Sequence, residues 1–135
     1  MEVIVLAAVQ WLHVFFGVVW FGSITYNNFI LWPDLKSKGM LTAAKAAGHE
    51  GRGKHMTAVL SIGTVGLGTL RGILGGALQD PFGVYGFTYL IALVIGLAMA
   101  IGVNAGWYKD SYGRAFYLVG FPTMFTLMIA MRFGY

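Results

Sequence analysis

A histidine lies in the middle of an apolar segment near the start of the chain. Trp11, Leu12, Val14 and Phe15 flank His13 on both sides. Ionisable groups inside such segments usually mark functional sites, because a hydrocarbon environment offers the imidazole no free water. Neutral imidazole is also the commonest metal ligand in proteins. His13 is therefore the first candidate for binding or redox chemistry, and the candidate metal ligand.

Three further side chains fall at a similar depth if the apolar segments alternate in direction. At about 1.5 Å of rise per residue, His13 lies about 15 Å and Arg71 about 12 Å from the same side. Met124 and Met128 lie about 16 and 10 Å from that side. A thioether can serve as an axial ligand of haem iron, and a buried guanidinium needs an anion. This geometry suggests a haem or metal site, in which a haem would have His13 as axial ligand, Met124 or Met128 opposite, and Arg71 at a propionate.

Helical spacing supports this grouping, because steps of three or four residues share one face of a helix. One face of the first segment carries Gln10, His13, Gly17, Trp20, Ile24 and Asn27. One face of the second carries Thr57, Ser61, Thr64, Gly68, Arg71 and Gly75, and one of the fourth carries Tyr117, Phe121, Met124, Met128 and Met131. Polar residues in a membrane span face the bundle interior. Trp20 is expected to pack on the ring of the cofactor.

Other interpretations of these residues stay open. His13 with Met124, Met128 and Met131 forms a soft ligand set that suits Cu(I), as in copper transport or resistance. A lone histidine can also simply bond to a Ser, a Thr or a carbonyl, in a cofactor-free accessory subunit. Two copies of His13 could flank one haem in a homodimer. Because the sequence contains no standard enzyme motif, enzyme activity stays undecided, with oxidoreductase as the class considered.

The composition shows what kind of frame holds these residues. The chain has 135 residues, of which 58% are hydrophobic and 10% charged, and its mean hydropathy is +0.73. Soluble domains have about 25% charged residues, so we expect an integral membrane protein with the lipid bilayer as its partner. The absence of cysteine excludes disulfides and iron–sulfur ligation. The net charge of +4 does not indicate nucleic-acid binding, because most basic residues flank apolar segments.

Four segments are long enough to cross a bilayer, which takes about 20 apolar residues. They run from about 3–31, 55–78, 84–107 and 114–133. Segments of this length span as helices, and short connections place consecutive helices antiparallel. The expected fold is all-α, a single transmembrane domain over residues 1–135 that forms a four-helix up-down-up-down bundle.

The basic residues predict the orientation of this bundle. Most of the Lys and Arg residues lie in or beside the first and third connections, 34–54 and 108–114. The positive-inside rule places these connections in the cytoplasm. We therefore expect a multi-pass protein of the cell's inner (plasma) membrane with both termini outside.

The segment 12–22 carries a pattern of the form Leu-His, six residues, Trp, one residue, Gly, formed by Leu12, His13, Trp20 and Gly22. This pattern resembles the first helix of a superfamily of small four-helix membrane proteins that includes the HemJ-type protoporphyrinogen oxidases and the copper-resistance CopD-like domains. The resemblance implies b-type haem at His13 and electron transfer with the quinone pool, alone or as a subunit of a larger oxidoreductase. For CopD-like members it implies copper handling. The oxidases also carry a basic residue in helix three, and segment 87–93 of this chain contains none. The resemblance therefore supports haem binding more strongly than it supports porphyrinogen oxidation.

Overall fold

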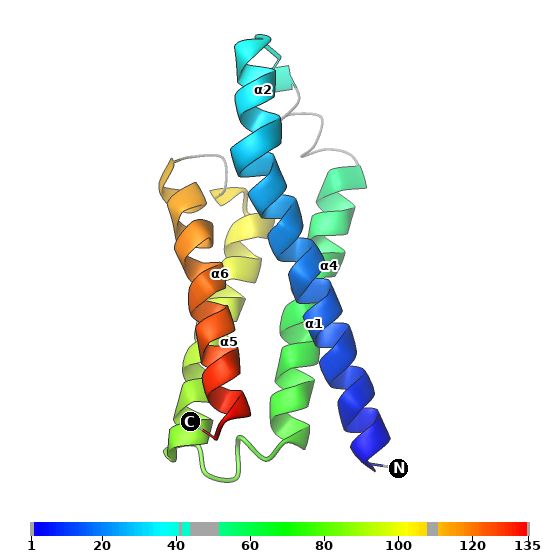
Figure 1. Ribbon diagram of the computed structural model, residues 1–135, viewed down its shortest axis with the longest axis vertical. Coiled ribbons are helices and arrows are strands. Elements are labelled where there is room, and N and C mark those ends of the chain that lie inside the picture. Colours follow the sequence, from blue (N-terminus) through cyan, green and yellow to red (C-terminus); the bar gives the residue numbers. More distant parts are fainter. Residues whose placement is uncertain (1, 41, 44–51, 108–110, 135) are drawn as a thin grey trace.

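The computed structural model describes residues 2–40, 42–43, 52–107 and 111–134, and these contain helices and turns but no strand. Within them, four helices are long and apolar enough to cross a membrane, at Val3–Ser37, Gly53–Leu74, Val84–Asn104 and Ser111–Arg132. The predicted all-helical bundle is thereby confirmed. Figure 1 shows the helices side by side, with the start of the first and the end of the last at the same end.

The first helix is longer than the sequence pattern indicates. Helix α1 (Glu2–Tyr26) continues through a π-helical turn η1 (Asn27–Leu31) into α2 (Trp32–Ser37). The backbone N–H of Trp32 donates to the carbonyl of Asn27, which is the wider spacing of a π turn. Pro33 does not end the helix at residue 31, because it lies in the first turn of α2, where its missing N–H is tolerated. Helix α2 therefore projects beyond the other helices (Figure 1).

Helix α4 (Arg52–Leu74) ends four residues before the predicted boundary at 78. Gly76 adopts a φ of 80°, a conformation that glycine accepts without a steric penalty. The N–H of Gly76 donates to Ile73 at 3.1 Å and that of Ala77 donates to Gly72 at 2.9 Å. This pair of bonds is a Schellman cap, so the apolar residues beyond Leu74 belong to the turn rather than to the helix.

Helices α5 (Val84–Asn104) and α6 (Ser111–Arg132) complete the bundle. Helix α4 packs between α1 and α5, and α6 packs on α5. An aromatic cluster joins α1 to α6, with ring centroids 5.1 Å apart for Trp20 and Phe121 and 5.5 Å apart for Phe21 and Phe125. The contact between α1 and α6 therefore lies toward the α2 end of the molecule, where the buried core is also found.

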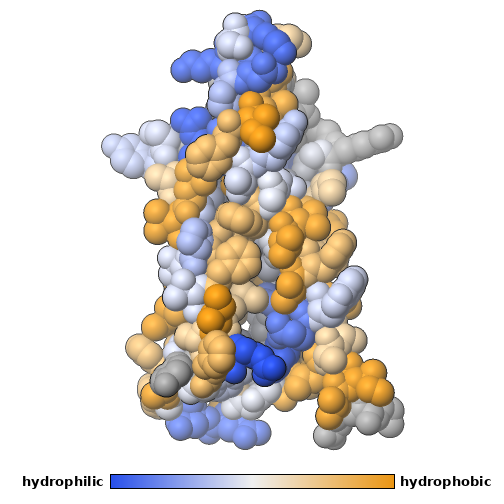
Figure 2. Space-filling view, viewed as in Figure 1, coloured by the Kyte–Doolittle hydropathy of each residue, from blue (hydrophilic) through white to orange (hydrophobic). Residues whose placement is uncertain are grey.

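The core is built from a few large side chains and two polar pairs. Its members are Trp20, Ile24, Leu60, Met99, Ala100, Val103, Tyr117 and Phe121. The Tyr117 hydroxyl donates to the Met99 carbonyl at 2.6 Å, and the Asn104 amide donates to the buried Ser61 hydroxyl at 3.0 Å. Figure 2 shows hydrophobic side chains spread over the flanks, with hydrophilic ones gathered mainly near the two ends.

The predicted interior face of the first helix agrees with the burial pattern. Trp20 and Ile24 are buried, at 3% and 8% exposure, whereas Trp11 and Val18 on the other side are 64% and 51% exposed. His13 is half-buried on the interior face. The apolar spacing of α1 is therefore sufficient to aim His13 at the other helices.

Candidate binding pocket around His13

A narrow pocket lies between α1, α4, α5 and α6 and contains His13. Its volume is about 100 Å³, and its walls are almost entirely apolar. The lining residues on α6 run from Phe121 to Met131, ten residues apart, which corresponds to about 15 Å of helix. The pocket is therefore a long slot rather than a compact hole.

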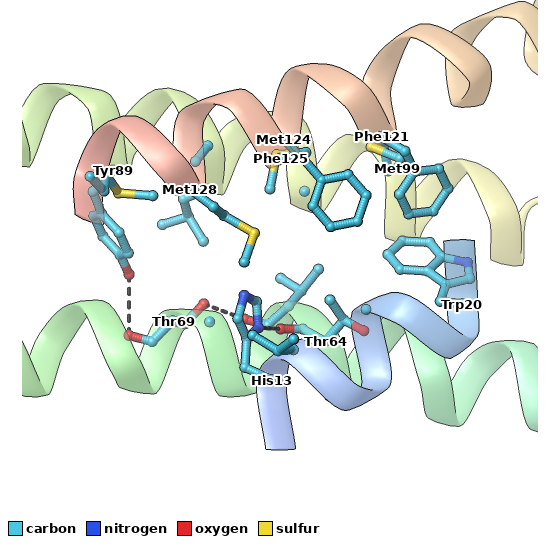
Figure 3. Close-up of a pocket in the computed structure, with 18 residues that line it drawn as sticks. His13, Trp20, Thr64, Thr69, Tyr89, Met99, Phe121, Met124, Phe125 and Met128 are labelled. Atoms are coloured by element: carbon cyan, nitrogen blue, oxygen red, sulfur yellow. Dashed lines mark hydrogen bonds between the residues drawn. The ribbon is translucent and has the colours of Figure 1, made fainter. Parts of the chain in front are cut away.

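His13 is fixed in this slot by one hydrogen bond to the backbone. Its Nδ1 lies 2.7 Å from the carbonyl oxygen of Thr64. A carbonyl only accepts, so Nδ1 carries the proton and donates. In the neutral imidazole, Nε2 then keeps a lone pair. Figure 3 shows the imidazole extending from α1 toward the Met128 thioether.

The side chain and the carbonyl of Thr64 are bonded to different groups. The Thr64 hydroxyl donates to the Leu60 carbonyl at 2.6 Å, within α4. The Thr64 carbonyl, which has two lone pairs, receives the imidazole of the neighbouring helix. Histidines that ligate metals commonly donate their second nitrogen to a carbonyl in this way, which fixes the tautomer and the ring orientation.

Of the two glycines at this interface, Gly68 is the one that leaves room for this bond. A Cβ built on Gly68 would lie 2.7 Å from Cε1 of His13, a separation that real side chains do not tolerate. A Cβ on Gly17 would meet Thr64 at 3.5 Å, an ordinary contact. The imidazole therefore occupies the volume that a side chain at position 68 would fill.

Most of the predicted site residues meet in this pocket. His13, Trp20, Met124 and Met128 all line it, and Met131 does so as well. In Figure 3, Trp20 closes one end of the slot and the methionines of α6 face His13 across it. The side chains that helical face and depth group together therefore line one pocket.

Arg71 does not line the pocket. It lies in the last turn of α4, where a Cβ on Gly75 would collide with its Nη1 and lie 3.2 Å from the Tyr85 hydroxyl. Its Nε and Nη1 atoms are buried, and no group of the described residues accepts from them. Arg71 is thus a half-buried cation, two of whose guanidinium nitrogens have no acceptor among the described residues.

A conventional metal cage is not found in the described part of the chain. No group of three or more His, Cys, Asp or Glu side chains there could hold a metal ion. His55 is exposed at the start of α4 and does not line the pocket. Any metal at His13 would therefore need thioethers or a cofactor to complete its coordination.

The sequence pattern predicted the helical faces of several pocket residues but not the hydrogen bonds that the pocket residues make. The acceptor for His13 is a backbone carbonyl, one of the partners that the sequence left open for this histidine, but the sequence does not indicate that it belongs to Thr64. Tyr89 and Phe125 line the pocket, and the Tyr89 hydroxyl donates to the Thr69 carbonyl at 3.2 Å. The only signal for Tyr89 was Gly72, whose absent side chain leaves room for the tyrosine ring.

Comparison with known proteins finds no matching family model, no similar curated protein and no similar solved structure. The function is therefore inferred from the geometry of the pocket, and the resemblance of segment 12–22 stays a prediction.

Proposed function

We propose that the chain is a multi-pass membrane protein whose four spans run up-down-up-down, with both termini outside the plasma membrane. The length and hydropathy of the four helices support insertion, as does the large apolar area exposed on their outer sides. Basic residues near the α1–α4 and α5–α6 connections support the orientation. The exposed apolar side chains include Val94 and Ile101, at 66% and 62%, and extended apolar surfaces of this kind are typical of membrane-facing helices.

Within this frame, we propose that the pocket holds a b-type haem for electron transfer, with His13 as its axial ligand. The observation that carries this proposal is the bond from Nδ1 of His13 to the Thr64 carbonyl, which leaves Nε2 as a lone-pair donor beside an apolar slot. Met128 is the preferred second ligand and Met124 the alternative. When bound, haem supplies one-electron transfer, and the ligand set tunes its potential.

The donor atoms fit haem, and the shape of the slot fits it in part. The slot is long and has small residues such as Gly17, Gly68 and Gly96 along its walls. Its volume of about 100 Å³ is below the roughly 300–1,000 Å³ of ordinary ligand pockets. Haem binding therefore requires α1 and α6 to separate on the His13 side of the contact between Trp20 and Phe121. The half-buried guanidinium of Arg71, whose Nε and Nη1 have no acceptor among the described residues, would then receive a haem carboxylate.

The small volume also favours a second candidate, a Cu(I) site. A single ion needs no separation of the helices, and His13 with the thioethers of Met124, Met128 and Met131 offers soft donors. In this case the protein would carry or sequester copper and would not transfer electrons. Copper and haem differ in colour and in metal content, so one preparation distinguishes them.

The test is a reduced-minus-oxidised visible spectrum of the protein purified in mild detergent from cells supplied with haem. The expected result is a b-type α-band that is lost in His13→Ala and kept in His55→Ala, the exposed histidine of α4. A colourless protein that binds one Cu(I) in a His13-dependent way would replace the haem proposal by the copper one. A haem band that survives in His13→Ala would overturn the assignment of the ligand.

A further inference from the structure

Helix α6 is divided by Pro122 into two parts that pack very differently. All its buried residues precede Pro122, and these are Gly113, Tyr117, Gly120 and Phe121. The part after the proline, residues 123–132, contains no buried residue. The part before it is also bonded to α5, because the Tyr117 hydroxyl donates to the Met99 carbonyl at 2.6 Å. The first part of α6 therefore belongs to the core, whereas residues 123–132 form an outer part that is loosely packed.

The backbone of α6 is weakened at the boundary between these two parts. Pro122 lies inside the helix and has no N–H, so it cannot donate to the carbonyl four residues earlier, that of Leu118. The Thr126 hydroxyl donates back to the Pro122 carbonyl at 3.0 Å, and bonds of this kind often bend a helix. Sharp bends of long helices occur mainly at such positions. Pro122 is therefore a natural hinge.

The outer part of α6 meets α1 only near this hinge. The ring of Phe21 on α1 lies 5.1 Å from that of Phe121 and 5.5 Å from that of Phe125. Helix α1 otherwise packs mainly on α4 and only slightly on α6. In Figure 1, α1 and α6 diverge from this contact toward the end of the bundle where both termini lie. A wedge between α1 and α6 therefore widens toward that end.

The His13 pocket reaches the molecular surface in this wedge. Val14 lines the pocket and is 40% exposed. It lies seven residues before Phe21, which places both on one edge of α1. On α6, Ile129 lies one turn beyond Phe125 on the same edge and is 60% exposed. Val14 and Ile129 thus flank a mouth on the side of the bundle, and both are apolar.

Little holds the outer part of α6 against its neighbours. Its two hydroxyls, those of Thr123 and Thr126, donate to carbonyls of α6 itself. The facing wall of α5 is small, since a Cβ built on Gly96 would meet Met124 only at 3.6 Å. His13, by contrast, is bonded to α4 through the Thr64 carbonyl. A movement of residues 123–132 would therefore open the pocket and leave His13 in place.

We propose that the outer part of α6, residues 123–132, is a side gate hinged at Pro122, through which the His13 pocket is loaded from the membrane. In the bilayer frame proposed above, the mouth faces the hydrocarbon of the leaflet on the side of the two termini. An apolar mouth in hydrocarbon admits an amphiphile that partitions into lipid and excludes a free ion. The identity of the ligand rests on the proposed haem function, whereas the movement of the gate does not.

The gate is tested first without a ligand, by distance measurements between spin labels. The chain contains no cysteine, so labels can be attached at chosen sites of the full chain in nanodiscs. The pair Val14→Cys and Ile129→Cys spans the mouth. The control pair, Ser23→Cys and Val119→Cys, joins exposed positions of α1 and of the part of α6 before Pro122. Pulsed EPR should give two separations for the mouth pair, one for the closed and one for the open gate, and a single separation for the control pair.

The hinge is tested with Pro122→Ala, which restores the missing backbone bond. This change should reduce the population of the longer separation at least fivefold. It should also slow haem uptake at least tenfold and leave the final haem content unchanged. Pro33→Ala is the matched control, because Pro33 lies in the first turn of α2, where a missing N–H is tolerated. A single narrow separation for the wild-type mouth pair, or uptake by Pro122→Ala at the wild-type rate, would overturn the proposal.

A bridge across the mouth gives an independent measurement. A short bismaleimide that joins the two cysteines of the mouth pair should slow both uptake and release of haem at least tenfold. Unchanged rates in the bridged protein would place the entrance elsewhere and reject the side gate. A moving gate in a protein without a haem band would disprove the haem function and keep the gate. A haem band with one fixed separation would give the reverse outcome.

Discussion

Gly68 and His13 are in contact across the interface of α1 and α4, and a Cβ at position 68 would lie 2.7 Å from Cε1 of the imidazole. The absent side chain therefore sets the position of the ring and its bond to the Thr64 carbonyl. Gly68 also lies in a run of glycines spaced by four residues, a pattern typical of close helix packing. Here it makes room for a functional side chain of the facing helix.

Gly68→Ala should displace the imidazole and weaken ligand binding at least tenfold. Overpacking of this kind typically destabilises by about 1–3 kcal/mol. Gly66→Ala is the matched control, because a Cβ at position 66 meets nothing within 4 Å. Ligand titration and thermal unfolding of both variants in detergent check the prediction. Equal behaviour of the two alanine variants would show that the contact does not position His13.

Arg71→Leu should have opposite effects on the empty and the loaded protein. Arg71→Leu should raise the unfolding temperature of the ligand-free chain, because Nε and Nη1 of this half-buried guanidinium lose water without gaining an acceptor among the described residues. Arg71→Leu should also reduce haem retention, since the haem propionate would lose the guanidinium proposed to pair with it. Arg132→Leu, at the exposed end of α6, should do neither. Unchanged haem retention in Arg71→Leu would remove Arg71 from the site.

Tyr117→Phe should lower the stability of the core. The hydroxyl of this fully buried side chain donates to the Met99 carbonyl at 2.6 Å, and such a bond contributes about 0.5–1.5 kcal/mol. Tyr112→Phe is the control, because Tyr112 is 87% exposed. Denaturant titration followed by circular dichroism should separate the two variants. Haem or copper binding should survive in both, since neither tyrosine lines the His13 pocket.

Gly72→Ala should be more damaging than Tyr89→Phe. The phenylalanine variant loses only the bond to the Thr69 carbonyl at 3.2 Å, a loss of about 0.5–1.5 kcal/mol. The alanine variant places a methyl group against the Tyr89 ring and must separate α4 from α5. Unfolding temperatures should therefore fall in the order wild type, Tyr89→Phe, Gly72→Ala. The reverse order would mean that the hydroxyl, and not the close approach of the ring, holds this interface.

The sequence was sufficient to predict four long apolar helices but not where they end. Apolar length and composition predict a span whatever its neighbours are, which is why all four were found. The end of α4 depends on Gly76, which adopts a positive φ. The apolar run contains several glycines, and the sequence does not indicate which of them adopts this conformation. The continuation of the first helix past residue 31 depends on the π turn at Asn27–Leu31, which no apolar period encodes.

The candidate site was predictable to the extent that it consists of side chains on helical faces. His13, Trp20, Met124 and Met128 share the expected interior faces and depth, and they line one pocket. The Thr64 carbonyl could not be predicted, because every residue has one and only the packing of α1 on α4 selects it. The sequence placed Arg71 at a depth similar to that of His13, but its side chain is not among those that line the pocket. Which way this side chain points depends on helix packing, which the sequence pattern does not describe.

The continuous path of α1, η1 and α2 has a mechanical consequence. Its 35 helical residues from Val3 to Ser37 extend about 50 Å at the usual rise, whereas the hydrocarbon core of a bilayer measures about 30 Å. A span that exceeds the membrane tilts or protrudes. Because His13 and Trp20 both belong to this one helix and line one pocket, a change in its tilt would displace both side chains together. Bilayer thickness, or a partner bound to the protruding end, would then change the shape of the pocket from a distance.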